Sequence, residues 1–202
     1  MRIWLACVLL LVPCARSWGD IVTFDLGSRV DGSAIDGVVS GMLTRDGLTA
    51  IFTANDGIMN ATSTYFGINA AASGDDTDQM DAGSGVNEFI TITFDAAVEF
   101  RQLSLASFTD GEVASIAVGL NAAVFRDGSG PNVLDFTADS FPLGNTISLG
   151  QTLVIGYTGP AASNGFSLEG FQVNTVPEPS ILGASWLLAG LSLLRRRRTL
   201  AA

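Results

Sequence analysis

A strict alternation of apolar and polar residues constrains this chain most. The stretch 89–94 reads Phe-Ile-Thr-Ile-Thr-Phe, which places the two isoleucines and Phe94 on one face of a strand and both threonines on the other. A helix would need an apolar period near 3.6, so the pattern favours a half-buried strand. A slip in the alternation near Gln102 predicts a β-bulge. Runs of the same kind predict strands at 21–26, 48–53, 89–94, 98–105, 113–118, 123–126, 146–149, 152–157 and 166–173.

Turn signals separate these runs. Asp-Gly dipeptides, which are typical of tight turns between antiparallel strands, begin at positions 31, 36, 46, 56, 110 and 127. The chain has only five glutamates and no lysine, so strong helix formers are scarce and no amphipathic helix stands out. Many short strands joined by such turns predict an all-β fold, an antiparallel β-sandwich that is jelly-roll-like.

Charge is distributed unevenly between the ends and the middle of the chain. Six of the ten arginines lie in the two ends. The stretch 20–176 keeps four arginines against nineteen acidic residues, a net charge of −15. Such a surface repels nucleic acid and anionic membranes, so we expect no nucleic-acid partner, whereas neutral partners and divalent cations remain open.

The segment 1–19 has the features of a secretory signal peptide, which predicts an N-terminal signal helix that the Sec translocon handles during export. Arg2 precedes an apolar run at 3–12, and Ser17 and Gly19 suit the −3 and −1 positions for cleavage before Asp20. The alternative is that this segment is a buried strand or helix of the fold.

Two other cleavage sites remain open at this end. One is cleavage before Trp18, and the other is a lipoprotein signal at Cys14, where Pro13 replaces the small residue expected. Both cysteines of the chain, Cys7 and Cys14, lie in this segment. The body then has no cysteine, so its core must hold without disulfides, and neither thiol catalysis nor a thiolate metal site is available.

A second apolar run lies near the end of the chain. Ile181 to Leu194 is free of charge over fourteen residues, about 21 Å as a helix against the roughly 30 Å of a membrane core. The run predicts a single transmembrane helix with transient inner-membrane insertion. The basic cluster that follows would stay on the cytoplasmic side, so the body would face away from the cytoplasm. This cluster consists of Arg195, Arg196, Arg197 and Arg198.

A short proline motif precedes that run. It consists of Val176, Pro177, Glu178, Pro179 and Ser180. Together with the apolar run and the arginines, at the end of a chain with a signal peptide, it resembles the PEP-CTERM sorting signal of Gram-negative bacteria. The resemblance implies recognition by an exosortase, processing of the tail at 176–202, and delivery to the cell surface or the extracellular matrix. A plain inner-membrane anchor on a periplasmic protein is the alternative.

The body carries a looser resemblance. The run Gly-Asp-Asp-Thr-Asp-Gln-Met-Asp at 74–81, followed by Asn87-Glu88 and the strand at 89–94, is similar to a pattern in the bodies of PEP-CTERM proteins. Those bodies resemble carbohydrate-binding jelly rolls, and the similarity covers about 65–175. It implies a jelly-roll-like β-sandwich domain at 20–175 and carries no biochemical role with it.

Missing residue types limit the chemistry of the body. The chain has no histidine and no lysine, which excludes a Ser-His-Asp triad, Schiff-base chemistry and a Walker lysine. Zinc is disfavoured for the same reason. Carboxylate chemistry remains, as a glycosidase-like pair or as a site for a hard cation.

The densest acidic cluster is a candidate Ca²⁺ site, and Ca²⁺ is the one cofactor that the sequence suggests. Its members are Asp75, Asp76, Asp78, Asp81 and Glu88. Oxygen ligands on a glycine-rich loop suit Ca²⁺, and Glu88 abuts a strand that would hold it rigidly. The spacing departs from the EF-hand loop, because the sixth position counted from Asp76, where glycine is required, is not a glycine. The alternative is a solvated acidic loop.

Sugar binding needs an exposed aromatic platform. The candidates are Tyr65 and Phe66, which lie near the acidic loop in the sequence, and Tyr157. By contrast, Phe94, Phe100 and Phe171 follow strand patterns and are predicted to lie in the core.

The sequence is therefore consistent with two classes of function. The first is a non-enzymatic exported surface or matrix protein, sorted by an exosortase and associated with extracellular polysaccharide. The second is a carboxylate-dependent carbohydrate-active enzyme, which needs two acids facing one cleft.

Overall fold

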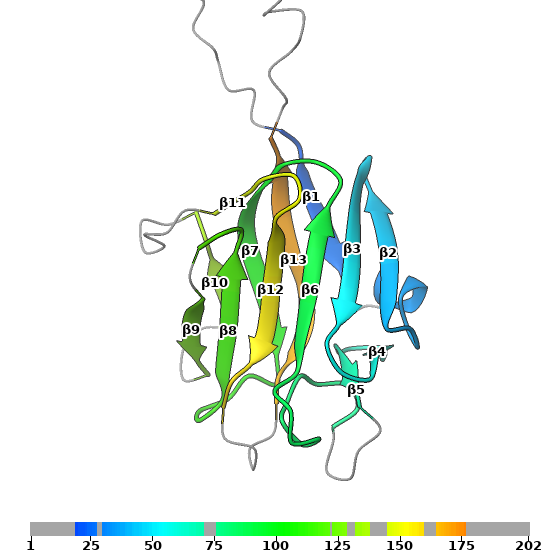
Figure 1. Ribbon diagram of the computed structural model, residues 1–202, viewed down its shortest axis with the longest axis vertical. Helices are drawn as coiled ribbons and strands as arrows, with labels where there is room; N and C mark the ends of the chain where they lie inside the picture. The colour runs from blue at the N-terminus through cyan, green and yellow to red at the C-terminus, as the bar shows by residue number, and fades with distance from the viewer. Residues whose placement is uncertain are drawn as a thin grey trace, which may run out of the picture.

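The computed structural model describes residues 19–27, 30–70, 76–121, 123–128, 132–137, 145–159 and 165–176. Within these ranges the chain is all-β apart from one 3-10 turn, η1 (Gly32–Ala34), as Figure 1 shows. The strands are β1 (Ile21–Asp25), β2 (Ser40–Arg45), β3 (Leu48–Ala54), β4 (Ile58–Ala61), β5 (Phe66–Asn69), β6 (Phe89–Phe94), β7 (Val98–Ala106), β8 (Val113–Val118), β9 (Val124–Asp127), β10 (Val133–Asp135), β11 (Thr146–Ile147), β12 (Thr152–Tyr157) and β13 (Ser167–Thr175).

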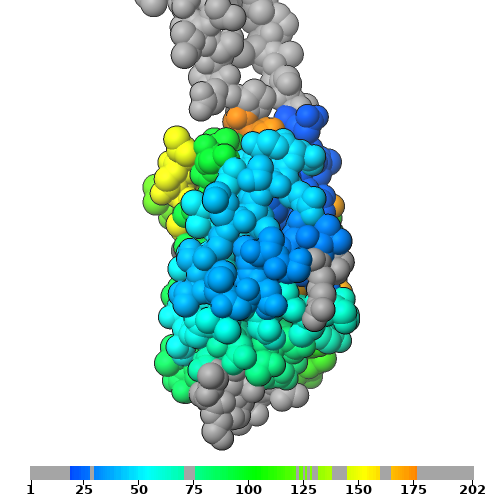
Figure 2. Space-filling view, turned by 90° about the vertical axis from the view of Figure 1, so that its right-hand side faces the viewer, coloured from blue at the N-terminus to red at the C-terminus, as the bar shows by residue number. Residues whose placement is uncertain are grey.

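These strands form two antiparallel sheets. The seven-stranded sheet has the order β10-β7-β13-β5-β4, with β1 also paired to β13 and β11 to β7. The six-stranded sheet has the order β2-β3-β6-β12-β8-β9 and faces the viewer in Figure 1. Figure 2 shows the molecule from the side at which β2 and η1 lie. The predicted all-β architecture with two packed antiparallel sheets is confirmed.

Phenylalanine rings join the two sheets. The ring centroid of Phe171 in β13 lies 4.9 Å from that of Phe24 in β1, both in the seven-stranded sheet. It lies 6.1 Å from Phe52 and 6.2 Å from Phe94, both in the six-stranded sheet. All of these rings are buried, as is Phe100, so the prediction of Phe94, Phe100 and Phe171 as core residues is confirmed. Non-directional burial of apolar surface between the two layers is the main stabilising term of such a fold.

Strand positions agree with the alternation wherever it is strong. Every strand predicted from the sequence has a counterpart, although some ends differ by a few residues. The predicted bulge is present too: Gln172 pairs with Gln102 and Val173 with Phe100, so Arg101 is the extra residue of β7. The sequence did not reveal β2, β4, β5 and β10. Glycine interrupts β2 and β5, and β4 and β10 have only four and three residues.

One Asp-Gly turn shows why the dipeptide is informative. Asp46 and Gly47 join β2 to β3 and have φ angles of 47° and 82°. Two successive left-handed residues match the right-handed twist of the flanking strands, and aspartate and glycine tolerate this conformation best.

The two ends of the described body lie side by side, at the top of Figure 1. The amide of Thr175 donates to the carbonyl of Asp20 at 3.4 Å, and Ile21 pairs with Asn174. Val176 is exposed, and its amide donates to the carbonyl of Ala97. The predicted signal helix, the rest of the sorting motif, the transmembrane helix and the arginine cluster lie outside the described residues. Within the described residues, no helix is long and apolar enough to cross a membrane.

Candidate functional site

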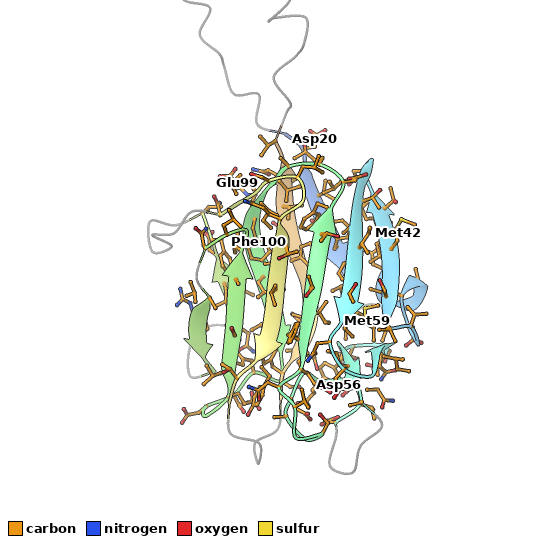
Figure 3. The ribbon with its side chains drawn as sticks, in the orientation of Figure 1. Asp20, Met42, Asp56, Met59, Glu99 and Phe100 are labelled. Carbon is orange, nitrogen blue, oxygen red and sulfur yellow. The ribbon has the colours of Figure 1, made fainter. Side chains whose placement is uncertain are left out.

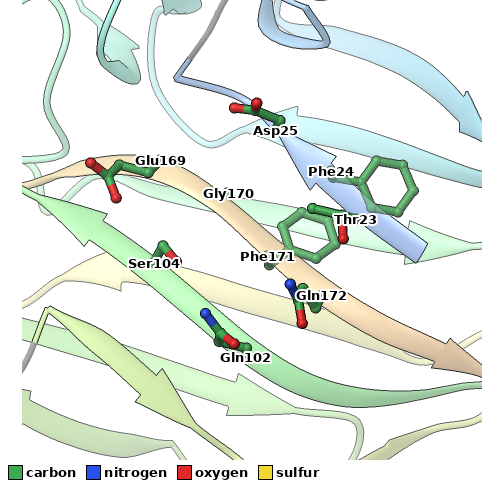
Figure 4. Close-up of a pocket in the computed structure, with 9 residues that line it drawn as sticks. All are labelled: Thr23, Phe24, Asp25, Gln102, Ser104, Glu169, Gly170, Phe171 and Gln172. Atoms are coloured by element: carbon green, nitrogen blue, oxygen red, sulfur yellow. The ribbon is translucent and has the colours of Figure 1, made fainter. Parts of the chain in front are cut away.

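A shallow groove crosses the outer face of the seven-stranded sheet, over β1, β13 and β7 (Figure 4). It has a volume of about 190 Å³. Its lining residues are Thr23, Phe24, Asp25, Gln102, Ser104, Glu169, Gly170, Phe171 and Gln172. The two phenylalanines are buried and stack on each other, so the side chains that open onto the groove are polar.

Strand register arranges these polar groups in rows. Thr23 of β1 pairs with Gln172 of β13, and Gln172 pairs with Gln102 of β7. Paired side chains on one face of a sheet lie about 5 Å apart. A hydroxyl and two amides therefore form a continuous polar row across three strands.

The next row contains the hollow of the groove. Gly170 lies between Asp25 and Ser104, and the missing side chain leaves a gap in the row. A Cβ atom on Gly170 would lie only 2.3 Å from the carbonyl oxygen of Phe24, so glycine also allows β1 to approach β13 closely. The neighbouring Glu169 is exposed and is the extra residue of a β-bulge, with no partner position on β7.

The bulge at Glu169 also secures the end of β1. Its carbonyl oxygen accepts hydrogen bonds from the amides of Leu26, at 2.8 Å, and Gly27, at 2.9 Å. These bonds fix the chain directly after Asp25. The two carboxylates of the groove, Asp25 and Glu169, are thereby placed at the same end of it.

A buried carboxylate supports the backbone beneath Asp25. The amide of Asp25 donates to Oδ2 of Asp31 at 2.8 Å, and Asp31 is only 4% exposed. The guanidinium of Arg45 forms an ion pair with Asp31. The hydrogen bond to the Asp31 carboxylate, and the negative charge of that carboxylate, raise the pKa of Arg45. The pair connects the loop after β1 with β2 of the other sheet, so both sheets contribute to the position of this end of the groove.

A third row of paired side chains lies beyond the groove, and its central residue, Asn174, is buried. Asn174 pairs with Ile21 on one side and Glu99 on the other, and is 3% exposed. The carboxylate of Glu99 accepts an amide hydrogen bond from Asn174 at 3.5 Å and one from Asn145 at 3.3 Å. The groove is therefore confined to the first two rows.

The donor and acceptor set of the groove suits a polyhydroxyl ligand. Carboxylates accept hydrogen bonds, amides both donate and accept, and hydroxyls do either. Adjacent hydroxyl groups of a sugar can bind such groups as bidentate partners. Two carboxylates, Asp25 and Glu169, also line this one groove.

Two of the predicted calcium ligands, Asp81 and Glu88, bind backbone amides. Asp75 lies outside the described residues. Asp81 is buried and accepts hydrogen bonds from the amides of Asp76, at 3.0 Å, and Gly83, at 2.7 Å. Glu88 is fully buried and accepts one from the amide of Asp81 at 3.0 Å. Among the residues with described positions, no group of three acidic side chains could hold a metal ion. Asp81 and Glu88 instead organise the backbone of this loop.

Asp78 and Asp76 form a repulsive pair in the same loop. Partial burial raises the pKa of Asp78 above its ordinary value of 3.8, and a hydrogen bond with Asp76 and the charge of Asp76 raise it further. A raised pKa in the folded state stabilises the fold below the ordinary pKa, and this stabilisation is lost as the pH rises through the raised value.

Asp78→Asn is therefore expected to raise the melting temperature at pH 7 slightly and to leave it nearly unchanged near pH 3. The gain should stay within the roughly 0.5 kcal/mol typical of surface changes. Thermal denaturation of both forms at the two pH values, with calcium or with EGTA, measures it. If calcium raised the melting temperature of the unmodified chain but not of Asp78→Asn, the loop would bind the ion. In calcium, Asp78→Asn would then melt at a lower temperature than the unmodified chain.

The predicted aromatic sugar contacts are mostly wrong. Phe66 is fully buried and Tyr157 is 2% exposed, because both strands turn these side chains into the core. Tyr65 is partly exposed and directly precedes β5, but it does not line the groove.

The groove itself was not predicted. The alternation in 21–26 correctly turns Thr23 and Asp25 outward, yet it does not reveal which strands flank them. The only local signal was a glycine inside a strand pattern, at Gly170, which often marks a bulge or a close backbone approach.

Comparisons of this chain with protein-family models, with curated proteins and with solved structures found no match.

Proposed function

We propose that this chain is an exported, non-enzymatic protein whose jelly-roll-like β-sandwich binds extracellular polysaccharide through the groove over β1, β13 and β7. The observation that carries the proposal is the polar hollow around Gly170, framed by amides, hydroxyls and carboxylates. The body at 20–175 is the working domain. The segment 1–19 directs export, and the PEP-CTERM-like tail at 176–202 directs sorting by an exosortase to the cell surface or matrix of a Gram-negative bacterium.

Charge narrows the class of ligand. The stretch 20–176 has a net charge of −15, and two of its acidic residues, Asp25 and Glu169, line the groove itself. An anionic polymer would be repelled, whereas a neutral polymer meets only hydrogen-bonding groups. We therefore propose a neutral, hydroxyl-rich polysaccharide as the ligand.

Gln172→Ala is expected to weaken polysaccharide binding about fivefold, because it removes the central amide of the first row, and one hydrogen bond contributes about 1 kcal/mol. Affinity electrophoresis of the full chain in gels that contain a panel of neutral polysaccharides measures the effect. Asn87→Ala removes an exposed amide outside the groove and is the matched control. Equal retardation of both variants, or no retardation of the unmodified chain by any polymer, would contradict the proposal.

The presence of two carboxylates in one groove supports a second candidate function, that of a glycoside hydrolase. In that case Asp25 and Glu169 would act as acid and as base or nucleophile. Incubation of the full chain with the retarding polysaccharide, followed by an assay for new reducing ends, separates the two functions. Release that disappears in both Asp25→Asn and Glu169→Gln would establish the enzyme and refute the non-enzymatic assignment.

The sorting part of the proposal has its own test. Intact-mass measurement of the native protein from inner membrane, outer envelope and medium should find a species that begins near Asp20, ends near the proline motif and lies outside the inner membrane. A species that keeps residues 181–198 and occurs only in the inner membrane would indicate a plain anchor instead.

A further inference from the structure

The outer face of the six-stranded sheet is uncharged across five strands. The strands β2, β3, β6, β12 and β8 turn alternate residues outward, and these include Ile51, Thr91, Thr93, Ser115 and Val154. Within these five strands the one charged residue is Arg45, which binds Asp31 beside the sheet edge. The face contains threonine, serine and aliphatic side chains instead.

The opposite face of the molecule is different. The outer side of the seven-stranded sheet carries Asp25, Glu99, Glu169 and the bulged Arg101. With a net charge of −15 over the stretch 20–176, acidic surface is the general condition of this body. An uncharged face of this extent is therefore an exception, and two copies of the chain could approach each other there without repulsion.

The apolar residues of this face are those of an interface. Met42, which projects from β2 and is labelled in Figure 3, is 64% exposed, Ile51 is 45% exposed and Phe89 is 38% exposed. Methionine and aromatic residues are enriched at the centre of protein interfaces, whereas charged residues are depleted there. Exposed apolar groups thus extend from the edge strand β2 through β3 to β6, and these strands carry no outward-facing charge.

Hydroxyl groups at the edge of this face are already paired. Ser40 donates to the carbonyl of Phe52 and lies 3.0 Å from the hydroxyl of Thr53, and the hydroxyls of Thr44 and Thr49 lie 3.2 Å apart. Covering a hydroxyl that has a partner within the same sheet costs less than covering one that depends on water.

We propose that this face binds a second copy of the chain, so that two six-stranded sheets pack against each other about a twofold axis. Sheets of this kind stack about 10 Å apart with their strands within about 30°. Five strands about 4.8 Å apart, each with about six residues at roughly 3.3 Å per residue, cover about 480 Å² of flat sheet. Side-chain relief brings this toward the roughly 800 Å² per partner of a standard interface.

A twofold arrangement explains the neutrality directly. In such an interface each patch meets its own copy, so any charge near the axis would face the same charge. The groove on the opposite sheet stays open in the pair, and two grooves then point away from each other. The dimer therefore does not depend on polysaccharide binding, and either proposal can fail alone.

The test uses a matched pair of substitutions in the full chain. Ile51→Lys places a charge on the proposed interface, and Ile21→Lys makes the same change on β1, where the isoleucine is 55% exposed on the other sheet. Sedimentation equilibrium in density-matched nonionic detergent, over roughly 1–100 µM, should find a dimer for the unmodified chain and for Ile21→Lys. Because a buried, unpaired charge is strongly unfavourable, Ile51→Lys is expected to raise the dissociation constant at least about 100-fold.

Each other outcome overturns the proposal. A monomer at all concentrations excludes the interface. Association that survives equally in both variants places the contact elsewhere, for instance in the apolar tail that both share. Loss of polysaccharide retardation in Ile51→Lys, with no change of mass, would assign the face to the polymer instead. Circular dichroism of Ile51→Lys, matching that of Ile21→Lys, establishes that the variant is folded.

Discussion

Phe171→Ala is expected to lower the free energy of unfolding by about 3–5 kcal/mol, the range for deleting a buried phenylalanine ring. Phe171 is 2% exposed, and its ring contacts those of Phe24, Phe52, Phe94 and Phe100. The substitution therefore removes the centre of the aromatic cluster between the two sheets. The described body contains no cysteine, so no disulfide adds to the stability that core packing provides. A loss of this size is a large fraction of the free energy of unfolding of an ordinary domain.

Urea denaturation followed by near-ultraviolet and far-ultraviolet circular dichroism measures this loss. Phe89→Ala, measured at a concentration below the dissociation constant of the proposed dimer, is the matched control, because it removes the same ring from a side chain that is 38% exposed. We expect the control to lose well under half as much stability. A loss below about 1 kcal/mol in Phe171→Ala would mean that the sheets do not pack through this ring.

Gly170→Ala is expected to destabilise the fold by about 2–3 kcal/mol, near the upper end of the range for overpacking, and to abolish binding in the groove. The new Cβ would lie 2.3 Å from the carbonyl oxygen of Phe24, a backbone atom that cannot rotate away. Strand β1 would have to move from β13. The bonds from Leu26 and Gly27 to Glu169 would lengthen, and Asp25 would leave its row.

Two measurements on Gly170→Ala separate these effects. Urea denaturation gives the change in stability, and affinity electrophoresis gives the change in polysaccharide retention. Ser104→Ala, in the same row, removes a hydroxyl and creates no backbone clash. It should keep nearly full stability and lose only part of the binding. Full stability in Gly170→Ala would show that β1 has more room beside β13 than its pairing indicates.

Local periodicity was sufficient for the strands with long, regular alternation. The runs that became β3, β6 and β8 have side chains that alternate between core and surface without interruption, and β12 does so over its first four residues. Burial of one face determines both the alternation and the strand, so the pattern carries the information. In β2 and β5 a glycine breaks the pattern, and their pairing partners determine the structure instead.

The groove depends on information that no single strand contains. Thr23, Gln172 and Gln102 are far apart in the sequence, and only the register of β1, β13 and β7 brings them into one row. That register depends on two bulges, at Glu169 and at Arg101, and each shifts the pairing by one residue. A shift of one residue exchanges the two faces of a strand, so the outer face could not be assigned without the bulges.

The acidic loop shows what composition leaves undetermined. Its composition predicted a cation site, but Asp81 and Glu88 are buried and bind backbone amides. Composition cannot distinguish a carboxylate that binds a metal ion from one that accepts hydrogen bonds from the backbone amides of a turn. The same is true of Phe66, since one position in the strand decides whether an aromatic ring faces solvent or core.

The position of β13 has a mechanical consequence. This strand lies between β1 and β7, contributes to the groove, and continues directly into the tail at Val176. A pull between a ligand in the groove and a tether at the tail would act along β13, parallel to the strand and perpendicular to its hydrogen bonds. Many bonds to both neighbours would then share the force at once and resist sliding together. Force applied between Asp20 and Thr175 would instead separate β1 from β13 one pair at a time, so the same fold would be strong in one direction and weak in the other.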